Sequence, residues 1–172
     1  NATGTVMGSG PSTVGADGSS VDGAEVTDAD DHHYTASVPA IDVETTVQTT
    51  FDADDPNGPM VAPGGDVLVT YTVTNPGPVA LSDVAVDDDA FGPATFVSGD
   101  TDSDGLLDPD ETWIFATTVP APGSGVETAT GTATGTGLPA TDSNGDPVPA
   151  TRVEAKDDHS FEVAVPVIDV ET

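Results

Sequence analysis

The segment DVLVTYTVT, residues 66–74, has an apolar side chain at every second position, and all but one of the others are polar. In an extended chain Val67, Val69, Tyr71 and Val73 share one face, while threonines occupy much of the other. Valine, threonine and tyrosine are also the residue types that favour strands. The segment therefore predicts a β-strand with one buried face.

The same alternation recurs in IDVETTVQ (residues 41–48), SDVAV (82–86), TWIFATTV (112–119) and FEVAV (161–165). Turn sequences rich in glycine and proline separate these segments: NPGP, FGP, APGSG and SNGDP. Six or seven short strands bounded by such turns predict an all-β fold, an Ig-like antiparallel β-sandwich. The residues expected to face its core are Ile41, Val43, Val47, Val84, Val86, Trp113, Phe115, Val119, Phe161, Val163 and Val165.

The composition restricts the possible partners. The 172 residues include 31 acidic side chains but only Arg152 and Lys156 as strong bases, a formal net charge of −29. Such a field repels nucleic acid and anionic lipid, and we expect neither nucleic-acid binding nor membrane insertion. Self-repulsion of this size favours a salt-rich habitat, bound calcium, or both. The alternating segments argue against an acidic disordered tail, and the absence of cysteine excludes disulfides and thiolate sites.

Residues 1–45 align without a gap on residues 128–172, and 19 of the 45 pairs are identical. This offset of 127 residues predicts tandem repeats. We expect residues 1–38 to be the C-terminal strands of a preceding Ig-like repeat, 39–166 a complete repeat, and 167–172 a linker or the start of the next. Short joints around Pro39 and Pro166 predict semi-rigid connections. The first segment must pair with another part of the polymer or with another chain, and the sequence leaves both open.

The loop SGDTDSDGLLDPDETW, residues 98–113, contains five aspartates and a glutamate within twelve residues. Its spacing is that of an EF-hand calcium loop, in which Gly105 permits a sharp bend. The flanking segments predict strands instead of helices, so we expect a structural calcium site and no sensor. The predicted ligands are Asp100, Asp102, Asp104, the Leu106 carbonyl, Asp108 (directly or through water) and Glu111.

Other polar clusters are weaker candidates. Asp52, Asp54, Asp55 and Asn57 offer a second ion site, although an acidic turn is the simpler interpretation. Residues 87–89 are expected to be solvated at the end of a strand. The DDH motif at residues 30–32 and 157–159 allows a metal role, but we favour a hydrogen-bonded entry to the last strand. Asp142, Asn144 and Asp146 are interpreted as a turn.

No nucleophile elbow, zinc-protease helix motif or phosphate-binding glycine loop is present, so we expect no enzyme. The segments DVLVTYTVTNPGPVALSDVAVDDD, GDTDSDGLLDPDETW and ATGTATG, with DDH near the end, resemble the Ig-like repeats of large bacterial and archaeal surface proteins. That resemblance implies a secreted protein built of tandem repeats.

The leading hypothesis is a calcium-stabilised Ig-like repeat of an extracellular stalk, adhesin or filament from a halophilic microbe. Its partners would be neighbouring repeats of the same polypeptide, and other copies of the chain in a filament. The alternative is a carbohydrate- or partner-binding adhesive module of a secreted protein. This alternative needs an exposed aromatic platform, for which Trp113, Tyr34 and Tyr71 are the candidates. We expect Trp113 to pack inward.

Overall fold

The computed structural model describes residues 2–9, 13–14, 20–21, 25–32, 38–48, 51–52, 58–141 and 146–164. The chain divides into two compact units between Ala36 and Ser37. All regular secondary structure in the described residues is β-strand. Among them there is accordingly no helix with the length and apolarity needed to cross a membrane.

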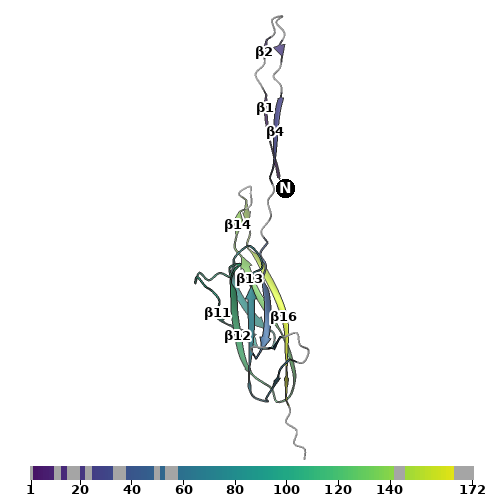
Figure 1. The fold of residues 1–172 in the computed structure, drawn as a ribbon, viewed down its shortest axis with the longest axis vertical. Coiled ribbons are helices and arrows are strands. Elements are labelled where there is room, and N and C mark those ends of the chain that lie inside the picture. The colour runs from purple at the N-terminus through teal and green to yellow at the C-terminus, as the bar shows by residue number, and fades with distance from the viewer. Residues whose placement is uncertain are drawn as a thin grey trace, which may run out of the picture. The chain divides into compact units, whose positions relative to one another are not determined.

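The first unit is built on a β-hairpin ladder (Figure 1). Strands β1 (Ala2–Ser9) and β4 (Glu25–His32) run antiparallel, with Ala2 opposite His32 and Ser9 opposite Glu25. Two short strands, β2 (Thr13–Val14) and β3 (Ser20–Val21), pair between them.

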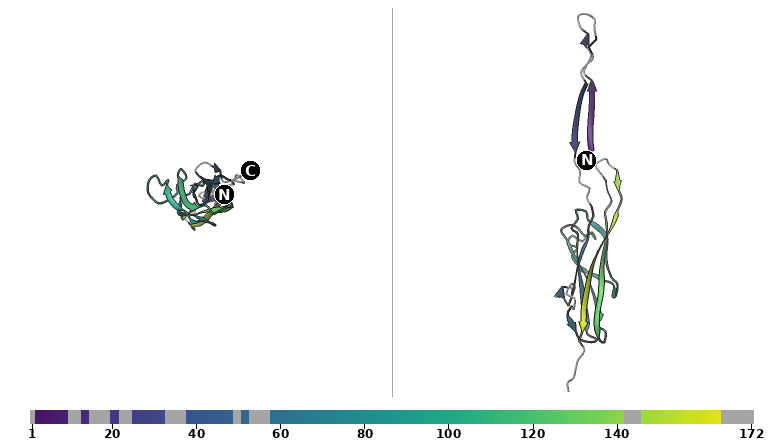
Figure 2. Two further views of the ribbon diagram at one scale, coloured as in Figure 1. Left: turned by 90° about the horizontal axis from the view of Figure 1, so that it is seen from below. Right: turned by 90° about the vertical axis from the view of Figure 1, so that its right-hand side faces the viewer.

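The second unit is a sandwich of two five-stranded sheets, whose long strands run side by side in Figures 1 and 2. One sheet has the order β10 (Gly92–Pro93), β9 (Leu81–Asp88), β13 (Gly125–Gly137), β16 (Thr151–Val163), β7 (Met60–Val61). The other has the order β11 (Thr95–Ser98), β12 (Thr112–Pro120), β8 (Asp66–Thr74), β5 (Asp42–Val47), β6 (Phe51–Asp52). A separate pair, β14 (Ala140–Thr141) and β15 (Pro147–Val148), extends the turn between β13 and β16.

This strand order is that of a constant-type immunoglobulin domain. The sheet β5–β8–β12–β11 corresponds to strands A, B, E and D, and β9–β13–β16 corresponds to C, F and G. The predicted all-β, Ig-like sandwich is confirmed in this arrangement. One pair departs from the antiparallel expectation, because β7 pairs with β16 in parallel over two residues.

The alternation in residues 66–74 produces the expected burial. Val67, Val69, Tyr71 and Val73 are all fully buried, and the intervening threonines are half-buried. Strand β8 lies between β5 and β12, so both of its backbone edges are hydrogen-bonded. Its inward side chains therefore form the centre of the core, as the quoted segment predicts.

Most of the other expected core residues are also buried. Val84 and Val119 are half-buried and pack against the core, whereas Val165 lies outside the described residues. The fully confirmed positions are Ile41, Val43, Val47, Val86, Trp113, Phe115, Phe161 and Val163.

Strand β9 contains an irregularity that period-two reasoning does not anticipate. Asp83 has a φ of 53°, and the register opposite β13 shifts between Thr134 and Thr136. The bulge returns Leu81 to the core side, where it is fully buried although it is three residues from Val84.

Candidate metal centre

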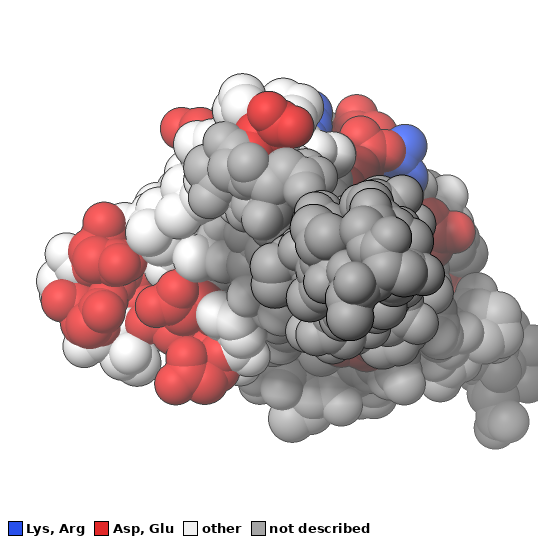
Figure 3. Space-filling view, turned by 90° about the horizontal axis from the view of Figure 1, so that it is seen from above, with Lys and Arg blue, Asp and Glu red and all other residues white. Residues whose placement is uncertain are grey.

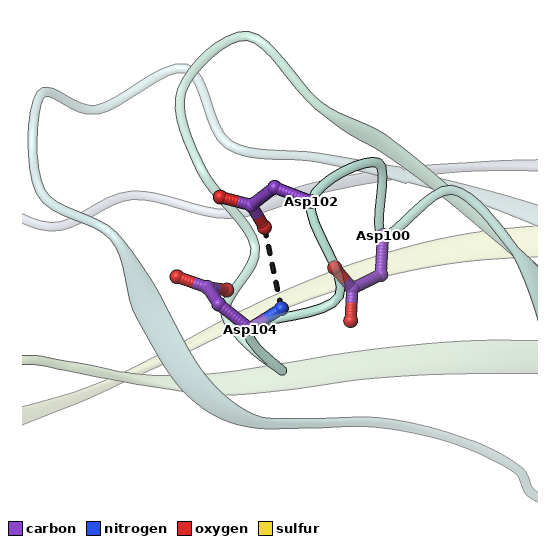
Figure 4. A group of neighbouring side chains, drawn as sticks. All are labelled: Asp100, Asp102 and Asp104. Atoms are coloured by element: carbon purple, nitrogen blue, oxygen red, sulfur yellow. Dashed lines mark hydrogen bonds between the residues drawn. The ribbon is translucent and has the colours of Figure 1, made fainter.

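The acidic loop follows β11 and leads into β12, so strands flank it on both sides. Asp100, Asp102 and Asp104 each place a carboxylate oxygen within 4.8 Å of those of the other two (Figure 4). The loop winds tightly because Ser103 and Gly105 have φ angles of 64° and 79°. A positive φ has little cost at glycine, which explains the residue at position 105.

Hydrogen bonds within the loop hold this geometry. Asp102 Oδ1 accepts from the backbone N–H of Asp104 at 3.3 Å, as drawn in Figure 4. Asp100 Oδ2 accepts from the N–H of Gly105 at 3.1 Å, and Asp104 Oδ1 accepts from the N–H of Leu106 at 2.8 Å. Each of the three aspartates thus uses one oxygen to shape the loop.

The second oxygen of Asp100 is different. Its Oδ1 is buried and has no hydrogen-bond partner. A buried carboxylate oxygen without a donor is costly, and a bound cation would satisfy it. Hard cations such as calcium take oxygen ligands of this kind, so the three aspartates fit the group that the sequence predicts.

The base of the loop is tied to the sandwich by Leu107. Its side chain is fully buried, and its backbone forms a two-way bridge with Leu81: N–H to carbonyl distances are 2.9 and 3.1 Å. The Asn75 side-chain amide also donates to the Leu107 carbonyl at 2.9 Å. The sequence analysis assigned a role to Leu106 and missed Leu107; its apolar character inside an acidic loop was the available signal.

Glu111 occupies a different environment from the three aspartates. Its Oε1 accepts from the Thr101 N–H and hydroxyl at 2.6 and 2.7 Å, and its Oε2 accepts from Trp113 Nε1 at 3.0 Å. The hydrogen bonds from Thr101, with that from Trp113, lower the pKa of Glu111 to about 2. Glu111 therefore closes the loop as an ionised hydrogen-bond acceptor, and its direct ligation of calcium stays a prediction.

Asp108 lies between these groups. It is half-buried, and its carbonyl accepts from the N–H of Glu111 at 3.1 Å. Partial desolvation, together with the negative charges of Asp104 and Asp102, raises the pKa of Asp108. The potential at the loop is therefore strongly negative, which favours a cation. Figure 3 shows acidic side chains gathered at several places on one face of the molecule and basic ones at one edge.

A second polar cluster lies in the core and joins the two sheets. The Tyr71 hydroxyl on β8 donates to Asp88 Oδ2 on β9 at 2.6 Å, and His159 Nε2 on β16 lies 3.4 Å from the same oxygen. The exposed fractions of these three residues are only 0, 2 and 2%. Asp88 Oδ1 accepts from the N–H groups of Ala90 and Phe91, both at 3.0 Å.

Burial sets the protonation of this Tyr71–Asp88–His159 cluster. Desolvation, reinforced by the hydrogen bond to Asp88, raises the pKa of Tyr71 and keeps it a neutral donor. Desolvation lowers the pKa of His159, against the opposing charge of Asp88. The cluster is closed to solvent, so its chemistry is that of a polar link between sheets.

Two sequence interpretations are wrong here. Asp88 was expected to be solvated, but the pleat of β9 places it on the same face as Val86, inside the core. The second DDH motif was expected to precede the last strand, but residues 157–159 lie within β16. The first copy, residues 30–32, likewise lies within β4.

The acids of the second DDH motif have structural partners. Asp157 Oδ2 accepts from the N–H of Thr45 at 2.6 Å, and Asp158 Oδ1 accepts from the Thr130 hydroxyl at 2.7 Å. These bonds link β16 to β5 and to β13. The side chains of Asp52, Asp54, Asp55 and Asn57, and residues Asp142 and Asn144, lie outside the described residues.

Comparison with protein-family models, with curated proteins and with solved structures found no match to this chain.

Proposed function

We propose that the chain is a structural segment of an extracellular stalk, adhesin or filament, in which an Ig-like sandwich is stabilised by calcium. The observation that carries this proposal is the buried, donorless Oδ1 of Asp100 beside the carboxylates of Asp102 and Asp104. Calcium would add ligand bonds across a loop that Leu107 and Glu111 already tie to the sandwich. The expected result is a stiffer loop and a more stable domain.

The packing of Pro39 and Ala40, just before β5, supports a mechanical role. A Cβ atom on Gly77 would lie 2.8 Å from the Ala40 nitrogen, and one on Gly137 would lie 2.6 Å from Pro39 Cβ. The segment before β5 is therefore seated closely between two glycines. Such seating would hold the start of each repeat against its own sandwich, which a stalk of repeats in series requires. The partners we propose are neighbouring repeats and other copies in a filament.

The charge supports an environment rich in salt. At about 1 M salt the screening length is roughly 3 Å, so a net charge of −29 would cost little stability there. We therefore propose a halophilic microbe as the source and the cell surface as the location.

The carbohydrate-binding alternative needs an exposed aromatic platform, and the two candidates for it that the structure describes are buried. Trp113 is only 7% exposed, with Phe96 and Phe115 packed against its ring, and Tyr71 is fully buried. Tyr34 lies outside the described residues. The Tyr71–Asp88–His159 cluster is closed to solvent, so a substrate has no access to it. We propose a non-catalytic protein.

The test is thermal unfolding of the chain in multimolar NaCl with and without millimolar calcium. If calcium exceeds its dissociation constant by about 100-fold, it stabilises the fold by about 2.7 kcal/mol. For a domain of this size that raises the midpoint by roughly 10 °C. Asp104→Ala, which leaves no side-chain oxygen for the cation, should abolish the rise. Asp110→Ala is the matched control: it removes the same charge and the same oxygens from an exposed residue of the same loop, and the rise should persist. The proposal fails if calcium has no effect, or if both variants respond alike.

A further inference from the structure

The two long hairpins of the chain have the same backbone register. In β1–β4, Ala2 lies opposite His32 and Gly4 opposite Asp30. In β13–β16, Ala129 lies opposite His159. Adding 127 to each residue number of the first ladder reproduces the second ladder pair by pair, through Ser9 with Glu25 and Thr136 with Arg152. The offset is the one that relates the two sequences, so the resemblance extends to strand pairing.

The β13–β16 hairpin is shaped by the strands that cover it. The edge of β13 that faces away from β16 is hydrogen-bonded to β9, with Gly131 opposite Asp88 and Gly137 opposite Leu81. A Cβ atom on Gly131 would lie 2.6 Å from Tyr71 Cε1, so the ring of Tyr71 occupies the space that a side chain would need. His159 reaches the Asp88 carboxylate beside that ring. Gly131 and His159 thus fit this hairpin to the strands β5 to β12, which we call the body of the repeat.

The first hairpin has the same residues at the corresponding positions. Gly4 corresponds to Gly131 and His32 to His159, and the two aspartates before the histidine also recur. Within the described part of the first unit, β1 pairs only with β4. The second unit has one set of strands from β5 to β12, and that set already covers β13–β16. The described residues therefore hold two hairpins with the same register and one set of strands, β5 to β12, of the kind that covers such a hairpin.

We propose that the β1–β4 hairpin is a docking surface for a second body of the β5–β12 type. A strand like β9 would pair antiparallel with the edge of β1, and a tyrosine equivalent to Tyr71 would fill the space above Gly4. An aspartate equivalent to Asp88 would meet His32. The partner is thus defined by its chemistry: a sheet edge in fixed register, an inserted phenol ring and a buried carboxylate.

The order of segments indicates where this body lies. In the second unit the body, residues 42–120, comes before its hairpin in the same polypeptide, and the sequence VPxIDVET follows both hairpins. By the same order, the body for β1–β4 would precede residue 1 in the same polypeptide. This inference rests on the repeat organisation of the proposed function and is independent of its calcium site.

The inference can be tested by supplying the body. Because Asn1 corresponds to Thr128, joining a copy of residues 38–127 directly before Asn1 restores the repeat spacing. Hydrogen exchange of the β1 and β4 amides is then compared between this extended chain and the 172-residue chain. We expect exchange in the extended chain to be about 100-fold slower or more, because the hairpin becomes part of a cooperative sandwich.

Two variants of the extended chain separate docking from general ordering. Gly4→Val should return the β1 and β4 amides to the rates of the 172-residue chain, because valine would occupy the tyrosine space. Valine favours strands, so it should not weaken the hairpin itself. Thr5→Val should keep the protection, because its counterpart Thr132 lies on the opposite face of β13 from Gly131.

Three outcomes would overturn the inference. The first is unchanged exchange in the extended chain. The second is equal protection in the Gly4→Val variant. The third is a calorimetric scan in which the added residues contribute no unfolding transition. A failure of calcium to stabilise the chain would leave all of these measurements unaffected, so the two proposals can fail separately.

Discussion

Replacing Tyr71 by phenylalanine would test the buried link between the two sheets. The ring keeps its packing against Gly131, and the variant removes only the hydroxyl that donates to Asp88 at 2.6 Å. Hydrogen bonds to charged groups contribute about 1.5–3 kcal/mol when buried. Asp88 keeps two backbone donors at 3.0 Å, from Ala90 and Phe91, so we expect a loss near the middle of that range, about 2 kcal/mol.

The assay is equilibrium unfolding in urea at neutral pH, in multimolar NaCl with calcium, followed by thermal unfolding under the same conditions. A loss of about 2 kcal/mol corresponds to a midpoint lowered by roughly 5–10 °C. The urea m-value should not change, because the surface exposed on unfolding is the same.

Thr130→Val is the matched control for this experiment. It also removes a hydroxyl that donates to a carboxylate, Asp158, at nearly the same distance, 2.7 Å, but this bond is exposed to solvent. We expect it to cost about 0.5 kcal/mol or less. If Tyr71→Phe costs no more than Thr130→Val, the reasoning that burial makes the Asp88 bond strong is refuted.

Two further predictions concern the loop base and the pH dependence. Leu107→Ala should destabilise the sandwich by about 2–5 kcal/mol, because it removes a fully buried side chain at the bridge to Leu81. It should also reduce the rise in the unfolding midpoint that calcium causes. An unchanged calcium effect would contradict the anchoring role of Leu107. Burial lowers the pKa of His159 in the folded state. Below about pH 6.5 the unfolded state therefore binds a proton that the folded state does not. As the pH decreases, the free energy of unfolding decreases too, until the folded histidine is also protonated. In urea titrations between pH 7 and 5, His159→Gln should therefore lose less stability than the unmodified chain, by at most about 1.4 kcal/mol per pH unit, whereas parallel curves would show that His159 does not contribute.

Much of the fold could be predicted because its signals are local. In residues 66–74 the alternation of side chains follows from the geometry of an extended strand, which turns successive residues to opposite faces whatever the neighbours are. The same reasoning placed Trp113 and Phe161 in the core. The spacing of Asp100, Asp102 and Asp104 is also local, since a tight loop brings every second side chain to one centre, and the three carboxylates do converge.

Asp88 and His159 show where local reasoning failed. Both are polar and lie in acidic sequences, which favours a solvated position, yet both share the inward face of their strands with Val86 and Phe161. Asp88 is satisfied there by the Tyr71 hydroxyl from the opposite sheet and by the backbone N–H groups of Ala90 and Phe91, whereas neither ring nitrogen of His159 has a hydrogen-bond partner. The sequence indicates on which face of its strand each residue lies, but not which residues of other strands it contacts.

The sequence alone determined that residues 66–74 and 112–119 form strands, which of their residues face the core, where the acidic loop lies and which segments recur. Tertiary structure decided that Leu107 bridges to Leu81, that Glu111 accepts from Thr101 and Trp113, and that three strands bring Tyr71, Asp88 and His159 together. The physical reason is the range of the interactions. Side-chain alternation and loop spacing depend on adjacent residues, whereas these contacts depend on how sheets pair and stack across long stretches of chain.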